Sequence, residues 1–313
     1  EMEMSPFKIA EIISREICVD GIVGFVEPAL PGFINIFLDQ NWILNQIDEL
    51  RRDPKDYFFQ NIGKGELVQI EYVSANPTGR LHVAHARGAV IGSTLSKLMT
   101  STGYTVHQEY YLNDSGSQVN KFNASLNVRY RQLFGEHIEL PDDSYPGQDI
   151  IDVAEEIKGT YGDIYLKLNR TQSEKELGVI GYKLMLSGIS EDVTTLGISF
   201  DEWFSEKSLI ETGALANCIE TLKNNGLVEH KDGAQWLLST KLGEEKDNVL
   251  IRRDGRPTYF ATDIAYHINK FLVRKFSKVI DIWGADHQGQ IPRLKSALSS
   301  LGVEADRLHI IVV

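Results

Sequence analysis

From residue 67 onward, the chain alternates short apolar runs with longer segments whose apolar positions follow helical spacing. Residues 67–73 predict a buried strand, and residues 84–100, which are rich in good helix formers, predict a helix. A break that contains Pro and Gly, at 76–79, separates the two. A second strand is expected at 105–111 and a second helix at 116–134. Because parallel strands need a crossover connection, this pattern predicts a βαβ unit and a parallel sheet.

The alternation is interrupted and then resumes toward the C-terminus. Residues 136–148 are rich in Pro, Asp and Gly and predict a turn-rich linker. The pattern is then mostly helical to about residue 225, with short strands near 227, 235–238 and 249–251. Beyond these, we expect a strand at 258–260, a helix at 262–275, a strand at 279–283, a helix at 289–300 and a strand at 308–312. Residues 1–60 predict a small α+β unit, with a helix at 7–17, a strand at 33–37 and a helix at 41–52.

Length and composition narrow the class of protein without identifying it. A chain of 313 residues normally divides into two or three domains. It contains no run of 18 apolar residues and no signal-peptide pattern, which predicts a soluble, cytoplasmic protein that does not contact membranes. Two cysteines, Cys18 and Cys218, are too few for a disulfide framework, and both are expected to be buried as small apolar side chains.

The net charge of −12 does not suggest nucleic-acid binding, because neutralisation of phosphates usually supplies much of that affinity. The distribution of charge matters more than its total, and acidic residues between 136 and 156 account for part of the excess. Basic residues gather in two places, which are Arg252, Arg253 and Arg256, and Lys270, Arg274, Lys275 and Lys278. A solvated helix face explains the second group at least as well as contact with RNA does.

Two histidines, His82 and His85, flank the expected start of the helix at 84–100. Free backbone N–H groups and the positive end of the helix dipole attract anions to such a position. Two imidazoles add directed donors, so the corner is predicted to hold the phosphates of a nucleotide such as ATP. The alternative is a solvent-facing or metal-binding pair, but a catalytic zinc site usually needs three protein ligands, and the zincin pattern needs a Glu that is absent here. No metal site on the protein is expected.

The segment His82-Val83-Ala84-His85 resembles the His-x-Gly-His signature of class I aminoacyl-tRNA synthetases. Ala84 departs from this signature and adds a methyl group where adenine would approach. Longer strings resemble the arginyl-tRNA synthetases among them: Ser74-Ala-Asn-Pro-Thr-Gly79, His85-Ala-Arg-Gly-Ala-Val-Ile-Gly92, Tyr110-Tyr-Leu-Asn-Asp-Ser-Gly-Ser-Gln118, Arg256-Pro-Thr-Tyr-Phe-Ala-Thr-Asp-Ile-Ala265 and Trp283-Gly-Ala-Asp-His287. The resemblance covers most of the chain and is weakest between about 126 and 240.

This resemblance implies an α/β fold. It comprises a Rossmann-like parallel-sheet catalytic domain, a mostly helical connective insertion and a partial small α+β N-terminal domain. The expected bounds are 1–62 for the N-terminal domain, 63–135 and 246–313 for the two halves of the catalytic domain, and 136–245 for the insertion. The resemblance also implies a fragment trimmed at both ends, because the lysine-rich second signature loop of the class does not occur in the chain.

The implied activity is arginine–tRNA ligation. ATP, with Mg²⁺ bound through its phosphates, would activate L-arginine as arginyl-adenylate, and the arginyl group would pass to the 2′-hydroxyl of the terminal adenosine of tRNA(Arg). The fragment is expected to charge tRNA poorly, and a monomer is expected. Two alternatives remain open on sequence: a small-molecule nucleotidyltransferase, and a non-catalytic tRNA-binding or regulatory paralogue.

The resemblance also assigns roles to individual residues. His82 and His85 would be catalytic, and the ATP site would comprise His82, Ala84, His85, Gly284 and Asp286. The arginine site would comprise Glu71, Ser74, Asn76, His85, Tyr259, Asp263 and His287. Tyr259 and Asp263 are four residues apart, so both would lie on one face of a helix. Read without the resemblance, Asp263 has a less favoured alternative as a helix-dipole partner, and Ser74 and Asn76 can be ordinary turn residues. Because ligands collect at the carboxyl ends of parallel strands, residues 71–85, 258–263 and 284–288 are expected to converge.

Overall fold

The computed structural model describes residues 4–54 and 57–313. The chain forms two compact units, Glu1–Gln60 and Asn61–Val313. The expected N-terminal domain, residues 1–62, includes positions 1–3 and 55–56, which lie outside the described residues. The other expected domain bounds, at 135 and 245, remain predictions. No helix in the described part of the chain combines the length and the apolar character needed to cross a bilayer.

The first unit pairs two helices with a two-stranded antiparallel sheet. Its elements are α1 (Pro6–Glu16), β1 (Val23–Ala29), β2 (Phe33–Leu38) and α2 (Gln40–Arg52). A side chain at the N-cap position begins each of the two helices. Ser5 caps α1 with Pro6 at its first turn, and the carboxylate of Asp39 accepts a hydrogen bond of 2.9 Å from the backbone N–H of Trp42 in α2. The two expected helices and the strand at 33–37 are therefore confirmed, and β1 is an addition. Cys18, expected to be buried, is exposed in this unit.

The second unit is built on a five-stranded parallel sheet of order β10-β9-β3-β4-β5. Apolar runs at β3 and β9 cross its centre, and side chains such as Val68, Ile70 and Val279 are completely buried. Such runs are typical of strands covered on both faces. The strands are β3 (Leu67–Glu71), β4 (Thr105–Leu112), β5 (Glu202–Ser205), β9 (Lys278–Trp283) and β10 (Leu308–Val312).

One expected strand is absent, and one strand that the structure contains was not expected. Residues 258–260 are not a strand, because the Thr258 hydroxyl accepts a hydrogen bond from the backbone of Ala261 and caps α9 (Tyr259–Ile268). The helix expected at 262–275 is present but begins three residues earlier and ends at Ile268, where the π-helix Asn269–Val273 follows. The edge strand β5 was not expected at all. It has only four residues and is defined by its pairing with β4, from Glu109↔Glu202 to Leu112↔Ser205.

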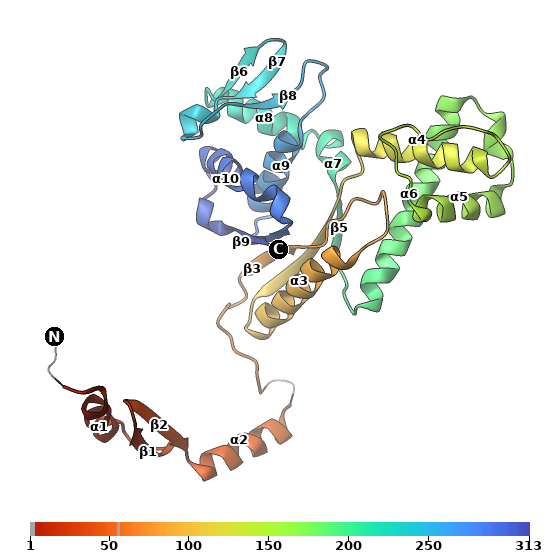
Figure 1. The fold of residues 1–313 in the computed structure, drawn as a ribbon. Helices are drawn as coiled ribbons and strands as arrows, with labels where there is room; N and C mark the ends of the chain where they lie inside the picture. The colour runs from red at the N-terminus through yellow and green to blue at the C-terminus, as the bar shows by residue number, and fades with distance from the viewer. Residues whose placement is uncertain (1–3, 55–56) are drawn as a thin grey trace. The chain divides into compact units, whose positions relative to one another are not determined.

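Helices cover the sheet and form a separate bundle. The helix α3 packs against β3, β4 and β9. The helices α4, α5 and α6 pack around their own buried cluster, which includes Phe122, Leu126 and Ile157, and stand together in Figure 1. The α-helices of the second unit are α3 (Val83–Ser101), α4 (Ser117–Gln132), α5 (Gln148–Tyr161), α6 (Arg170–Thr195), α7 (Glu206–Glu211), α8 (Ala214–Asn224), α9 (Tyr259–Ile268) and α10 (Ile291–Ser300). Short 3₁₀ turns span Ile164–Lys167, Ser239–Leu242, Ala285–Gln290 and Ala305–Arg307, and a π-helix spans Asn269–Val273.

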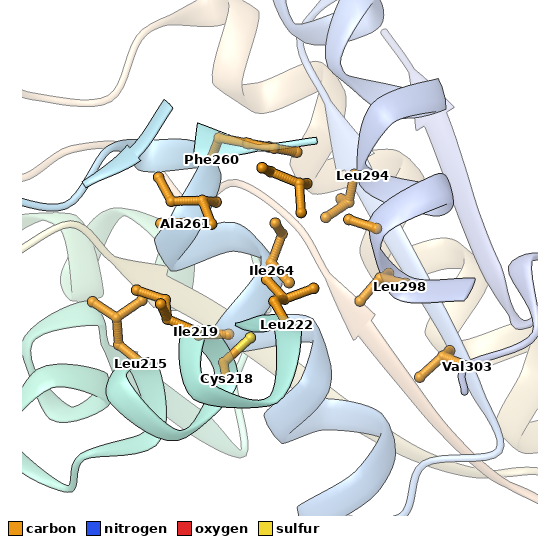
Figure 2. Close-up of a cluster of buried hydrophobic side chains, with 14 of the residues drawn as sticks. Leu215, Cys218, Ile219, Leu222, Phe260, Ala261, Ile264, Leu294, Leu298 and Val303 are labelled. Carbon is orange, nitrogen blue, oxygen red and sulfur yellow. The ribbon is translucent and has the colours of Figure 1, made fainter. Parts of the chain in front are cut away.

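The largest apolar cluster fixes α9 in place. Side chains of α8, α9 and α10 meet there, among them Cys218, Leu222, Ile264 and Leu298 (Figure 2). Cys218 is buried, as expected. A three-stranded antiparallel sheet lies beside these helices and comprises β6 (Val228–Lys231), β7 (Ala234–Leu237) and β8 (Asn248–Ile251). Because α9 is held by this core, the residues at its N-terminus have defined positions at the edge of the sheet.

Gly92 lets α3 approach the sheet. A Cβ atom added there would lie 2.2 Å from the ring of the completely buried Tyr72. We therefore expect Gly92→Ala to lower the free energy of unfolding by about 1–3 kcal/mol in chemical denaturation. The matched control is Gly159→Ala in α5, where a Cβ meets nothing within 4 Å. This control should gain about 0.5–1 kcal/mol. A loss of stability in both variants would contradict the steric explanation.

Candidate active site

A cavity of about 450 Å³ opens at the carboxyl ends of β3, β4 and β9. The strands, the start of α9 and the turn after β9 all contribute side chains to it. Most of the residues predicted from the sequence line it: Glu71, Ser74, Asn76, Tyr259, Asp263, Gly284, Asp286 and His287. Residues from the segments 71–85, 258–263 and 284–288 therefore meet at one cavity, as expected. The segment 258–263 comes from the start of α9 and not from a strand.

The backbone turns sharply where β3 enters the cavity. Val73 and Ser74 have positive φ angles of 68° and 40°, so β3 ends at Glu71 and not at 73 as expected. Such a conformation is strained for a β-branched residue and persists only where surrounding contacts hold it. The Ser74 hydroxyl supplies two such contacts. It donates to Oε1 of Glu71 at 3.0 Å and accepts from the backbone N–H of Tyr111 at 3.0 Å. The turn thereby orients the Glu71 carboxylate.

The cavity is rich in carboxyl groups. Glu71, Asp263 and Glu206 line it. Burial, together with the nearby charges of Glu71, Glu206 and Asp281, raises the pKa of Asp263 to about 7, while His267 opposes the shift. Burial also raises the pKa of Glu206, whose carboxylate accepts a hydrogen bond of 2.9 Å from Ser115. A group of acids whose ionisation is held back in this way is suited to a cationic ligand, because the cation would restore their charge.

A second cavity of about 380 Å³ lies at the start of α3. His82 is the N-cap of this helix, and its backbone N–H donates to Nδ1 of His85 at 3.2 Å. The two imidazole rings are 3.9 Å apart between centroids. Burial and the neighbouring His82 lower the pKa of His85. Two imidazoles and the free N–H groups of a 19-residue helix thus face one hollow, which is a suitable place for an anion.

Asn76 lines both cavities, which therefore share a wall. Its side-chain amide donates to Oε1 of Gln118 at 2.6 Å. His85, predicted for both the nucleotide and the amino-acid site, lines the second cavity and not the first. Ala84 is exposed and lines neither. The structure therefore brings most of the predicted residues into two adjoining hollows but leaves Ala84 outside both.

Sequence reasoning missed several lining residues. Glu206 follows β5 in the segment where the resemblance is weakest, so no motif marked it. Gln118 ends one of the resembling strings and could have been chosen on that ground. The second cavity is closed by three residues of the turn-rich linker, Tyr145, Pro146 and Gly147, and by Asp149 in the first turn of α5. The Asp149 carboxylate accepts a hydrogen bond of 3.0 Å from the backbone N–H of Arg80, and only the fold could reveal this contact across 69 residues.

Comparison with known proteins gives a consistent result. A family model described as "tRNA synthetases class I (R), catalytic domain" matches residues 54–297. An arginine–tRNA ligase from Dehalococcoides mccartyi is 45% identical over 97% of this chain and 54% of its own length. One from Caldanaerobacter subterraneus is 44% identical over 100% of this chain and 56% of its own length. The chain spans about half the length of the curated relatives it matches.

Solved structures show the same fold. A candidate arginyl-tRNA synthetase from Campylobacter jejuni is 38% identical, with a TM-score of 0.80 over 87% of this chain and 59% of that one. The arginyl-tRNA synthetase of Thermus thermophilus is 20% identical, with a TM-score of 0.65 over 98% of this chain and 57% of that one. At that lower identity, the likeness concerns the fold alone.

Proposed function

The chain belongs to the arginyl-tRNA synthetase family of class I, and on that premise we propose that it activates L-arginine with ATP for transfer to tRNA(Arg). Arginyl-adenylate would form first. The arginyl group would then pass to the 2′-hydroxyl of the terminal adenosine of the tRNA. We further propose that the protein works as a monomer in the cytoplasm.

The observation that carries this proposal is the acidic cavity of about 450 Å³ between α9 and the sheet. Tyr259 and Asp263 lie four residues apart on the first turns of α9 and both line this cavity. A guanidinium is a planar fork with five donors, and a carboxylate accepts two of them in parallel. Asp263 would bind this fork, with the Tyr259 ring beside it. Glu71, Ser74 and Asn76, which line the cavity from the end of β3 and the turn after it, would receive the α-ammonium and neighbouring polar groups. His287 would border the same ligand.

The second cavity would hold the phosphates of ATP. A carboxylate oxygen of arginine would form a bond to the α-phosphorus while the bond from this phosphorus to the pyrophosphate oxygen breaks. His82, His85 and the N–H groups of α3 would stabilise the charge that builds on the phosphoryl oxygens. Asn76 lies in the wall between the two cavities, where the two reacting groups would have to meet. Gly284 and Asp286, which line the first cavity, would lie along the adenosine.

Mg²⁺ would accompany the triphosphate. Mg²⁺ in nucleotide sites is commonly held by one or two carboxylates together with phosphate oxygens. Asp149 lines the second cavity, but its two carboxylate oxygens accept backbone hydrogen bonds from Arg80 at 3.0 Å and Ile150 at 3.1 Å, so phosphate oxygens would hold the ion. The ion would neutralise phosphate charge, while the histidines and α3 orient the phosphates. In the second step, the 2′-hydroxyl of the tRNA would attack the carbonyl carbon of the adenylate, and AMP would leave.

Titration calorimetry with free amino acids tests the proposal directly. We expect the 313-residue chain to bind L-arginine and to bind L-lysine about 100-fold more weakly or worse, because a single ammonium leaves acceptors of the cavity unpaired. L-Citrulline, which has the shape of arginine without its charge, is the matched control and should also bind weakly. Equal affinity for lysine, or preference for another amino acid, contradicts the assignment. Arginine-dependent ATP–pyrophosphate exchange with added tRNA then tests the chemistry in a protein of the relatives' full length.

A further inference from the structure

Four acidic residues form a row across the central sheet, close to the carboxyl ends of its strands. Asp281 of β9 pairs with Glu71 of β3, Glu71 pairs with Glu109 of β4, and Glu109 pairs with Glu202 of β5. In-register neighbours point to the same face of a sheet, so the four side chains lie side by side. Asp281 and Glu109 are completely buried, and Glu71 nearly so. Like charges in such positions destabilise the fold unless cations compensate them.

Two cations from one segment compensate this row. Lys270 lies in the π-helix Asn269–Val273 that follows α9, and Arg274 comes directly after it. The buried Nζ of Lys270 lies 2.7 Å from Oε2 of Glu71 and 2.8 Å from Oδ1 of Asp281. The guanidinium of Arg274 bonds to Glu109, and to Oε2 of Glu202 at 2.9 Å. Each cation therefore bridges one pair of neighbouring strands. A π-turn inside a helix often marks a functional position.

The pair bridged by Lys270, Glu71 and Asp281, differs from the pair bridged by Arg274, Glu109 and Glu202, in its relation to the first cavity. Glu71 lines it, whereas Glu109 and Glu202 do not. Both oxygens of Glu71 are held, Oε2 by Lys270 and Oε1 by the Ser74 hydroxyl. Burial raises the pKa of Glu71, and the charge of Lys270 opposes this shift. Burial would also raise the pKa of Asp281, but Lys270 and His267 hold it below its usual value.

We propose that Lys270 is a positioning residue, which holds the Glu71 carboxylate ionised and directed toward the cavity so that this carboxylate can receive the amino-acid substrate. The inference rests on the proposed function, because arginine is the ligand. Lys270 itself does not line the cavity. Its role is to separate Glu71 from Asp281. Without it, the two acids would share a proton, and the protonated Glu71 would no longer attract a cation.

Several ionisable groups face Glu71 and enter any test that varies pH. Lys270, Tyr266 and Asp263 face it from α9 and the π-helix, Asp281 from β9, and Glu109 and Tyr111 from β4. Beside them, His267 bridges the backbone oxygen of Asp263 and Oδ2 of Asp281, each at 2.7 Å. Protonation of Asp263, whose pKa is raised to about 7, is expected to weaken arginine binding by the wild-type chain as the pH falls below that value. A change in the pKa of Glu71 would appear as a shift in the dependence of arginine affinity on pH.

The test measures arginine affinity by calorimetry between about pH 6 and pH 9 in the wild type and in Lys270→Met. We expect the variant to bind arginine roughly tenfold more weakly near pH 7, and we expect this deficit relative to the wild type to shrink as the pH rises and Glu71 ionises again. Lys270→Arg keeps the cation and should restore most of the affinity. Asp281→Asn frees Lys270 for Glu71 alone, so its profile should move in the opposite direction, toward binding at lower pH.

Arg274→Met is the matched control, because it removes the corresponding cation from the pair that lies outside the cavity. It should lower stability but leave the pH profile of arginine binding close to that of the wild type. Weakening of equal size at every pH in Lys270→Met, or identical profiles in the Lys270 and Asp281 variants, overturns the inference. Should Lys270→Met not fold, the direction of the shift in Asp281→Asn decides the matter. If the wild type itself does not bind arginine, the proposed function fails instead.

Discussion

Replacement of Asp263 by asparagine is expected to weaken L-arginine binding by about 100-fold or more near pH 8. The reason is that the amide removes the charge that would face the guanidinium and turns one acceptor of the parallel pair into a donor. Calorimetry with arginine measures the loss. In the wild type, the affinity should fall as the pH drops below about 7, since protonation of Asp263 has the same effect as the substitution. The variant should lack this pH dependence.

The loss of binding in Asp263→Asn should not come from loss of the fold. Burial raises the pKa of Asp263 to about 7, above the value of about 3.9 for an unfolded aspartate. The folded state therefore binds the proton more tightly. The contribution of Asp263 to the free energy of unfolding declines as the pH rises from about 4 to about 7, and it is lowest above that range. Asp263→Asn should accordingly melt at a higher temperature than the wild type near pH 8, and the gain should shrink toward pH 5.

An exposed aspartate in the same region provides the control. Asp254 lies before α9 and pairs with Arg256 at the surface. Asp254→Asn should leave both the affinity for arginine and its pH dependence unchanged. A Kd for arginine in Asp263→Asn within threefold of the wild-type value would exclude Asp263 as the guanidinium partner.

Substitution of either signature histidine should slow the activation step. His82→Ala and His85→Ala are each expected to lower the rate of arginine-dependent ATP–pyrophosphate exchange by about 100- to 1000-fold. The imidazoles face the second cavity together with the N-terminus of α3, so their removal withdraws donors from the phosphates while the acidic cavity stays intact. Exchange is measured with tRNA present, in a protein that has the full length of the curated relatives.

The position of His82 outside the first cavity makes this prediction specific. Arginine affinity measured without ATP should stay near the wild-type value in His82→Ala, because the residue does not line the cavity proposed for the amino acid. His137→Ala, an exposed histidine in the linker before α5, is the control and should keep full exchange activity. A loss of arginine affinity in His82→Ala without a loss of rate would reverse the roles given to the two cavities.

Local sequence was sufficient for the elements that carry the site. The apolar runs of β3 and β9 and the helical pattern of α3 were readable because their spacing depends only on neighbouring residues. The signature histidines lie at the start of α3, where helix chemistry places an anion. The family strings then grouped residues such as Tyr259 and Asp263. The meeting of residues 71–85, 258–263 and 284–288 at one site was predicted from a general rule, because ligands of parallel sheets bind at the carboxyl ends of strands.

Only the tertiary structure shows which charged side chains are buried beside the site and which of them pair. The strand β5 and Glu206 could not be read from the chain, because a four-residue edge strand is stabilised by pairing with β4 and not by its own composition. Lys270 looked like part of a solvated basic helix face but is completely buried. It neutralises Glu71 from 199 positions away. Patterns along a sequence report which side chains avoid water. Which buried carboxylate meets which cation depends on strand order and register, and the folded chain alone determines these.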